Sequence, residues 1–76
     1  MSVCPITSLS KGMRAKVAGV EGDGALRSRL AALGVRLGEE ITLLRVSPLR
    51  RTYLVETRDT IFALGKEAAS CVKVER

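Results

Sequence analysis

The side chains that could do chemistry in this 76-residue chain are carboxylates, thiols and guanidinium groups, because the chain has no histidine. Without histidine, neither a Ser-His nor a Cys-His nucleophile pair can form. The acidic residues fall at expected turns or on the polar side of expected strands, so we interpret them as solvated charges and helix caps rather than as acid–base pairs. They are Glu21, Asp23, Glu39, Glu40, Glu56, Asp59, Glu67 and Glu75. The sequence therefore predicts a protein that is not an enzyme.

A glycine-rich segment comes close to a dinucleotide-binding motif. Gly22-Asp23-Gly24 begins the pattern GxGxxG, but Arg27 stands at the last glycine. About 20 residues further on, the chain offers Thr42 and Leu43 rather than the acid that would hold a ribose. We interpret these glycines as turn formers. The phosphate-binding pattern GxxxxGK[ST] is absent from the sequence, so we expect no hydrolysis of GTP or ATP.

The two cysteines, Cys4 and Cys71, lie far apart in sequence and belong to no CxxC pair. Met1–Leu9 has neither the basic start nor the apolar run of a signal peptide, so we expect a cytoplasmic protein with two free thiols. We interpret Cys71 as a buried apolar thiol. The spacing of ligand-type residues predicts no metal site and no cofactor, although a contact between Cys4 and a transition metal stays open. No apolar run approaches the roughly 20 residues that span a bilayer.

The basic residues are the better candidates for function. There are 13 Lys and Arg against 8 Asp and Glu, for a net charge of +5; a charge of about this size is also normal for a small soluble domain. Arginines cluster in two places, which together we predict to be a partner-binding surface. These candidates are Arg27 and Arg36 near an expected helix, and Pro48, Leu49, Arg50 and Arg51 in an expected loop.

The nature of the partner is suggested by the scarcity of aromatic residues. Binders of single-stranded nucleic acid combine cations with aromatic platforms for the bases. Here Tyr53 is the one aromatic side chain that could serve as a platform, since we expect Phe62 in the core. A protein-docking face is therefore favoured, and a small basic nucleic-acid-binding barrel is the alternative.

One helix is expected at about Ala25–Leu33, with Asp23 or Gly24 as its N-cap. Three leucines recur at positions i, i+4 and i+7 and so share one face: Leu26, Leu30 and Leu33. Gly34 stands where a helix end needs a left-handed residue, and Val35 is placed to fold back on the apolar face. Gly38 then precedes an alternating run typical of a strand. A helix this short needs a sheet to pack against.

The rest of the chain reads as short strands separated by turn residues. Strands are expected at Arg14–Val20, Ile41–Val46, Thr52–Thr57, Thr60–Leu64 and Cys71–Glu75, with a lead-in at Val3–Leu9 and a helical turn at Gly65–Ser70. This pattern predicts one domain over residues 1–76. Its fold class is mainly β, a small SH3-like, partly open barrel of about five strands with a short helix inserted after the first strand.

In its ordered motifs the chain resembles the FeoA family. The segments that carry the resemblance are Leu9-Ser10-Lys11-Gly12, Ala15-Lys16-Val17, Arg29 to Val35 with Gly38, Ser47-Pro48-Leu49, Ala63-Leu64, Glu67-Ala68 and Val72-Lys73-Val74. The resemblance implies an SH3-like barrel and a non-enzymatic accessory role in bacterial ferrous iron uptake. The implied partner is the cytoplasmic GTP-binding region of the FeoB membrane transporter, and self-association stays open.

The chain departs from the family mainly in its loops. Family members usually follow Pro-Leu with a Gly-Asp-Pro-like turn, whereas Arg50-Arg51-Thr52 stands here. Such changes bear on the partner more than on the fold. The same fold also occurs attached to iron-dependent repressors, but this sequence contains no pair of DNA-binding helices, so we do not expect a free-standing repressor.

Overall fold

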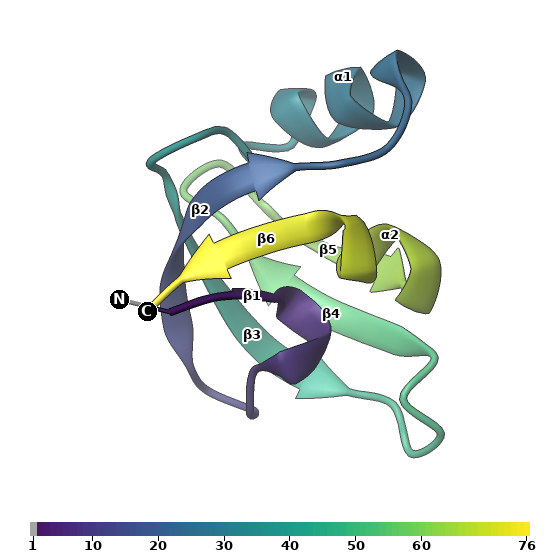
Figure 1. Cartoon of the computed structure of the whole chain (residues 1–76). Helices are drawn as coiled ribbons and strands as arrows, with labels where there is room; N and C mark the ends of the chain where they lie inside the picture. The colour runs from purple at the N-terminus through teal and green to yellow at the C-terminus, as the bar shows by residue number, and fades with distance from the viewer. Residues whose placement is uncertain (1) are drawn as a thin grey trace.

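In the computed structural model, which describes residues 2–76, the chain forms one antiparallel sheet that curls into an open barrel (Figure 1). Met1, the first residue of the predicted domain, lies outside the described residues. The strands are β1 (Val3–Pro5), β2 (Arg14–Val20), β3 (Glu40–Val46), β4 (Thr52–Glu56), β5 (Ile61–Gly65) and β6 (Val72–Glu75). Their order in the sheet is β1-β6-β2-β3-β4-β5, so β1 and β5 form the two edges. Helix α1 (Gly24–Ala32) follows β2, and helix α2 (Lys66–Cys71) follows β5.

The predicted fold class is confirmed, with six strands rather than about five. The additional strand, β1, lies in the segment that we expected to be a lead-in, and it pairs antiparallel with β6. A short 3-10 helix, η1 (Ile6–Ser8), follows it directly. Three residues are too few to show the alternation that reveals a strand in a sequence, so only the pairing with β6 defines this one.

The core lies inside the barrel and consists mainly of alternate strand residues, supplemented by residues from the helices and loops. Each strand from β2 to β4 buries two side chains at period two, as the alternation predicts. The buried residues include Ala15, Val17, Ile41, Leu43, Tyr53, Val55, Leu64, Val72 and Val74, with Ile6 and Leu9 from the N-terminal segment. Tyr53 is 1% exposed. It therefore cannot be the base-stacking platform that a nucleic-acid-binding barrel would use.

Helix α1 packs on the end of the barrel rather than on its side (Figure 1). The side chain of Asp23 caps its N-terminus, since Oδ1 accepts a hydrogen bond from the Leu26 amide at 2.8 Å. Leu30 is buried, whereas Leu26 and Leu33 are only half-buried. Leu26 packs against the same core cluster as Leu30, but Leu33 does not, so the predicted apolar face holds for two of the three leucines, with Leu30 as its buried anchor.

The helix ends in the predicted glycine motif. Gly34 has φ +98°. Its amide donates to the Ala31 carbonyl at 3.1 Å, and the Val35 amide donates to the Leu30 carbonyl at 2.9 Å. These two bonds form a Schellman motif, which satisfies carbonyls left free at the helix end. Val35 is consequently buried, and the chain is directed toward β3.

Candidate functional site

Pro48, Leu49, Arg50 and Arg51 come together in the loop between β3 and β4, which we call the arginine loop (Ser47–Arg51). Ser47 holds this loop closed: its Oγ accepts hydrogen bonds from the amides of Arg51 and Thr52, both at 3.1 Å. The Arg50 amide donates to the Ser47 carbonyl at 2.8 Å. The side chain of Leu49 is 74% exposed at the tip of the loop. The loop therefore presents an apolar side chain on a backbone held by hydrogen bonds.

Arg50 has a structural part in the arginine loop. Its φ of +55° lies in the left-handed region of backbone conformations, which residues other than glycine and asparagine rarely adopt. Its Nη2 donates to the Thr7 carbonyl at 3.2 Å, which ties the loop to η1. Arg51 is exposed and makes no ion pair among the described residues. Of the two arginines, Arg51 is thus the one whose guanidinium is free for a partner.

Arg36 lies at the other end of the barrel, in the turn after α1. Its Nη1 donates to the Ala31 carbonyl at 2.8 Å, and its Nη2 forms an ion pair with Asp59 at 3.2 Å. Both side chains of this pair are about half exposed, so the pair contributes little to stability. These contacts fasten the helix end to the turn between β4 and β5. Arg27 is exposed on α1 and is predicted, like Arg36, as a partner contact.

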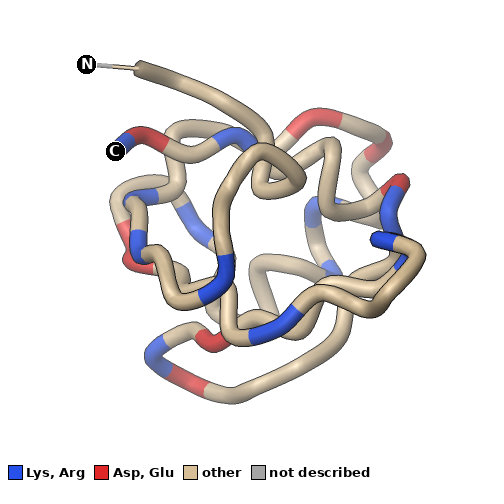
Figure 2. The backbone as a smooth tube through the Cα atoms, turned by 90° about the horizontal axis from the view of Figure 1, so that it is seen from below, with Lys and Arg blue, Asp and Glu red and all other residues tan. Residues whose placement is uncertain are grey.

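The two predicted groups of partner-binding residues are not neighbours. Arg36 precedes the seven residues of β3 and the arginine loop follows them, which corresponds to a separation of roughly 20 Å along the strand. Figure 1 shows α1 and the arginine loop at opposite ends of the barrel. Figure 2 shows the lysines and arginines spread around the backbone in that view rather than gathered on one side. A phosphate backbone would therefore find no continuous cationic track there.

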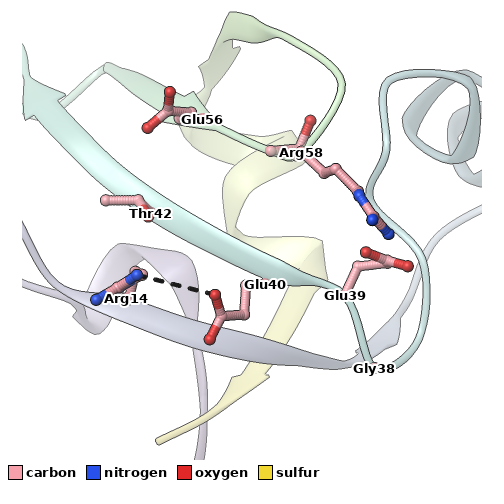
Figure 3. A pocket seen from close by; sticks show the side chains of 8 residues that line it. Arg14, Gly38, Glu39, Glu40, Thr42, Glu56 and Arg58 are labelled. Atoms are coloured by element: carbon pink, nitrogen blue, oxygen red, sulfur yellow. Dashed lines mark ion pairs between the residues drawn. The ribbon is translucent and has the colours of Figure 1, made fainter.

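A polar hollow that the sequence did not reveal lies on the outer face of β2, β3 and β4 (Figure 3). Its volume is about 410 Å³. Arg14 and Glu40 form an ion pair of 4.0 Å across it, while both side chains remain mostly exposed. The lining residues are Arg14, Gly38, Glu39, Glu40, Thr42, Glu56, Thr57 and Arg58. The strand register brings these residues together, and pairing partners cannot be read from a single sequence.

Thr57 joins the helix end to the barrel. It is 7% exposed, and its hydroxyl donates to the Leu33 carbonyl at 2.6 Å. The Thr60 amide donates to the same hydroxyl oxygen at 3.3 Å. One side chain thus satisfies a free carbonyl at the end of α1 and shapes the turn between β4 and β5. This role could not be predicted from the sequence, because a threonine that follows a strand is ordinary.

We expect Thr57→Val to lower the free energy of unfolding by about 1–3 kcal/mol, because the change leaves the Leu33 carbonyl without its partner while keeping the side-chain volume. Chemical denaturation of both proteins measures the difference. Thr60→Val is the matched control, since Thr60 is exposed and its hydroxyl makes only a 3.4 Å contact. Equal stability of the two variants would contradict the role assigned to Thr57.

Clustered metal ligands and membrane-length helices were both sought among the described residues. Among residues 2–76, no three histidine, cysteine, aspartate or glutamate side chains come together in a group that could hold a metal ion. Cys4 and Cys71 are both free and half-buried. None of the helices in the described part of the chain is long and apolar enough to cross a membrane.

Comparison with known proteins points to one family. A family model described as "FeoA domain" matches residues 4–76. Among solved structures, the FeoA protein of Chlorobium tepidum is 28% identical with a TM-score of 0.87, and the match covers 93% of this chain and 68% of that one. The FeoA of Stenotrophomonas maltophilia, solved as a complex with zinc and called a procaryotic SH3 domain protein, is 29% identical with a TM-score of 0.80, covering 93% and 88%.

A second group of solved structures shares the fold alone. A manganese-dependent transcriptional repressor in complex with manganese is 18% identical, with a TM-score of 0.87. The match covers 97% of this chain and 36% of the repressor, so the likeness is to one domain of a longer protein. No curated protein sequence matches this chain significantly.

Proposed function

This chain belongs to the FeoA domain family, and on that premise we propose that it is a non-enzymatic accessory module of ferrous iron uptake that docks on the cytoplasmic GTP-binding region of a FeoB-type transporter. Membership of the family supports the role in ferrous iron transport. The docking on FeoB is our proposal. In this role Fe²⁺ is the cargo of the transporter rather than a ligand of the module.

The exposed Leu49 at the tip of the arginine loop is the observation that carries the docking proposal. Protein interfaces typically place an apolar anchor in a pocket of the partner and surround it with polar groups. Leu49 has the exposure of such an anchor, and Arg51 lies beside it with a free guanidinium. Because Ser47 already orders the loop backbone, little conformational entropy is lost on docking.

The charge of the loop defines the partner surface that it fits. An apolar pocket bordered by carboxylates would accept Leu49 and pair with Arg51. Arg50 is less suited to such a contact, because its guanidinium is engaged with Thr7. Arg27 and Arg36 remain predicted contacts, but at the far end of the barrel they would serve a second surface of the partner.

The alternative of a small nucleic-acid-binding barrel has less support. Tyr53 is buried and so offers no platform for a base, and in the view of Figure 2 the lysines and arginines are spread around the backbone rather than gathered on one side. Binding to RNA or DNA that fell steeply with salt, but stayed useful at physiological ionic strength, would nevertheless favour this alternative.

We expect Leu49→Ser combined with Arg51→Glu to weaken binding to the soluble GTP-binding domain of the transporter from the same organism by about tenfold or more, because it removes the anchor and reverses its neighbouring charge. NMR titration of the labelled module at physiological salt measures both affinity and location. Shifts should cluster on the arginine loop.

Arg29→Glu is the matched control, since it reverses one charge at an exposed position of α1 that is not among the predicted contacts. It should bind within about twofold of the parent if the arginine loop carries the contact. If Arg29→Glu weakens binding and the loop variant does not, the loop assignment is wrong. If neither the parent nor any variant binds the domain, the proposed partner region is wrong.

A further inference from the structure

Strand β5 is an edge of the sheet, so no second strand pairs with its outer side. In an antiparallel ladder, hydrogen-bonded residue pairs alternate with pairs whose amides and carbonyls point away. The Thr57 amide donates to the Thr60 carbonyl at 2.8 Å, and the Lys66 amide donates to the Arg51 carbonyl at 2.9 Å. The ladder between β4 and β5 continues this register without interruption. The amides and carbonyls of Ile61, Ala63 and Gly65 therefore face away from β4.

These edge groups are open to water rather than covered by the fold. Ile61, Ala63 and Gly65 are all exposed, and no strand other than β4 pairs with β5 among the described residues. The carbonyl of Gly65, the N-cap of α2, accepts the first hydrogen bond of that helix, so the groups left for another strand are the three amides and the carbonyls of Ile61 and Ala63. The Thr60 hydroxyl reaches the Ile61 carbonyl only at 3.4 Å. A row of free donors and acceptors of this kind is a template for another strand.

The opposite edge of the sheet shows how this fold protects an edge. Strand β1 is three residues long and ends in Pro5, and both features discourage pairing. Strand β5 has five residues, with no proline, no charge and no bulge. Its outer face is apolar, because Ile61 is 53% exposed and Ala63 lies beside the half-buried Leu54. Left unpaired, such an edge is a liability that proteins normally avoid.

We propose that two copies of this chain pair through β5, antiparallel about a two-fold axis at Ala63, to form one sheet continuous across both barrels. In this register Ile61 of one copy lies opposite Gly65 of the other, so that all three outward-facing residues meet. The two strands can approach closely, because Ala63 has a small side chain and Gly65 has none. The proposal is independent of the transporter-docking role, which uses the arginine loop.

The charges at the two ends of β5 are complementary in this arrangement. Glu56 lies beside Ile61 on the outer face of one end, and Lys66 follows Gly65 at the other end. Neither side chain has an ion-pair partner among the described residues. An antiparallel pair brings Glu56 of each copy toward Lys66 of the other. The same register brings Asp59 toward Glu67, and the ion pair of Asp59 with Arg36 offsets that repulsion.

A second copy fits this edge better than a strand of arbitrary sequence. Antiparallel self-pairing joins the anionic end to the cationic end twice, by symmetry, and places the apolar residues at the centre. The contact is short, since the strand has only five residues. The dimer should therefore be weak and should form in the concentration range of an NMR sample.

The test is a concentration series of the purified full chain, followed by sedimentation equilibrium and by NMR. We expect a monomer–dimer equilibrium, with concentration-dependent shifts and slowed amide exchange at Ile61, Ala63 and Gly65. Ala63→Lys places like charges at the two-fold axis and should abolish the dimer. Ala32→Lys, the same change at an exposed position on α1, should leave dimerisation unchanged.

Exchanging the charges of Glu56 and Lys66 tests the proposed register between the two β5 strands. Glu56→Lys and Lys66→Glu should each weaken the dimer, and the double variant should restore it toward the parent affinity. A chain that stays monomeric at all concentrations overturns the proposal. So does a dimer whose shifts map to the arginine loop or α1, or one that survives Ala63→Lys while the variant keeps the parent fold.

Discussion

Gly34→Val is expected to lower the free energy of unfolding by roughly 2–5 kcal/mol, a large part of the stability of a domain this small. Two costs add at this position. The residue has φ +98°, a conformation that a β-branched side chain strongly resists. A Cβ there would also lie 2.7 Å from Thr57 Oγ1 and 3.0 Å from Thr57 Cβ, and both residues are buried. Chemical denaturation followed by circular dichroism measures the loss.

The variant Gly38→Val separates the cost of backbone strain from the cost of the steric clash. Gly38 has φ +86°, close to that of Gly34, but nothing lies within 4 Å of the position where its Cβ would stand. It carries the backbone strain without the steric clash, so it should be clearly less destabilising than Gly34→Val. Equal losses for the two variants would mean that the contact with Thr57 contributes nothing. An unchanged Gly34→Val protein would rule out the left-handed helix end.

Leu30→Ala is the second large effect, with an expected loss of about 2–5 kcal/mol. Leu30 is 2% exposed and is the one buried residue of α1. Helices of this length depend on packing rather than on intrinsic propensity. Removing this buried anchor should therefore loosen the helix as well as reduce global stability. Amide exchange throughout α1 should accelerate more than exchange in β3 and β4.

Leu37→Ala provides the control, because that leucine is 76% exposed and lies in the neighbouring turn. Its effect should stay within about 0.5 kcal/mol. Leu26→Ala should fall between the two, since Leu26 is half-buried. A Leu30→Ala protein with uniform amide exchange across helix and sheet would contradict the view that Leu30 anchors the helix.

The sequence by itself determined the class of fold and most of its elements. Period-two alternation located β2 to β6 to within a few residues, because each strand has one face in the core and one in water. Asp23 and Gly34 marked the helix ends, since a cap and a left-handed residue are local requirements. The ordered motifs also pointed to the family, which the family model confirms over residues 4–76.

Only the tertiary structure decided how these elements form surfaces. Strand β1 exists because β6 pairs with it, and Thr57 is important because the chain brings it against Leu33. The predicted partner-binding residues turned out to occupy two ends of the barrel, since β3 separates Arg36 from Arg51. The unprotected edge at β5 appears only once the order of strands is known. Helix caps, turns and hydrophobic periodicity depend on neighbouring residues, so they can be predicted from a single sequence. Strand register and strand order depend on contacts between residues far apart in the sequence, and a single sequence does not show which residues meet.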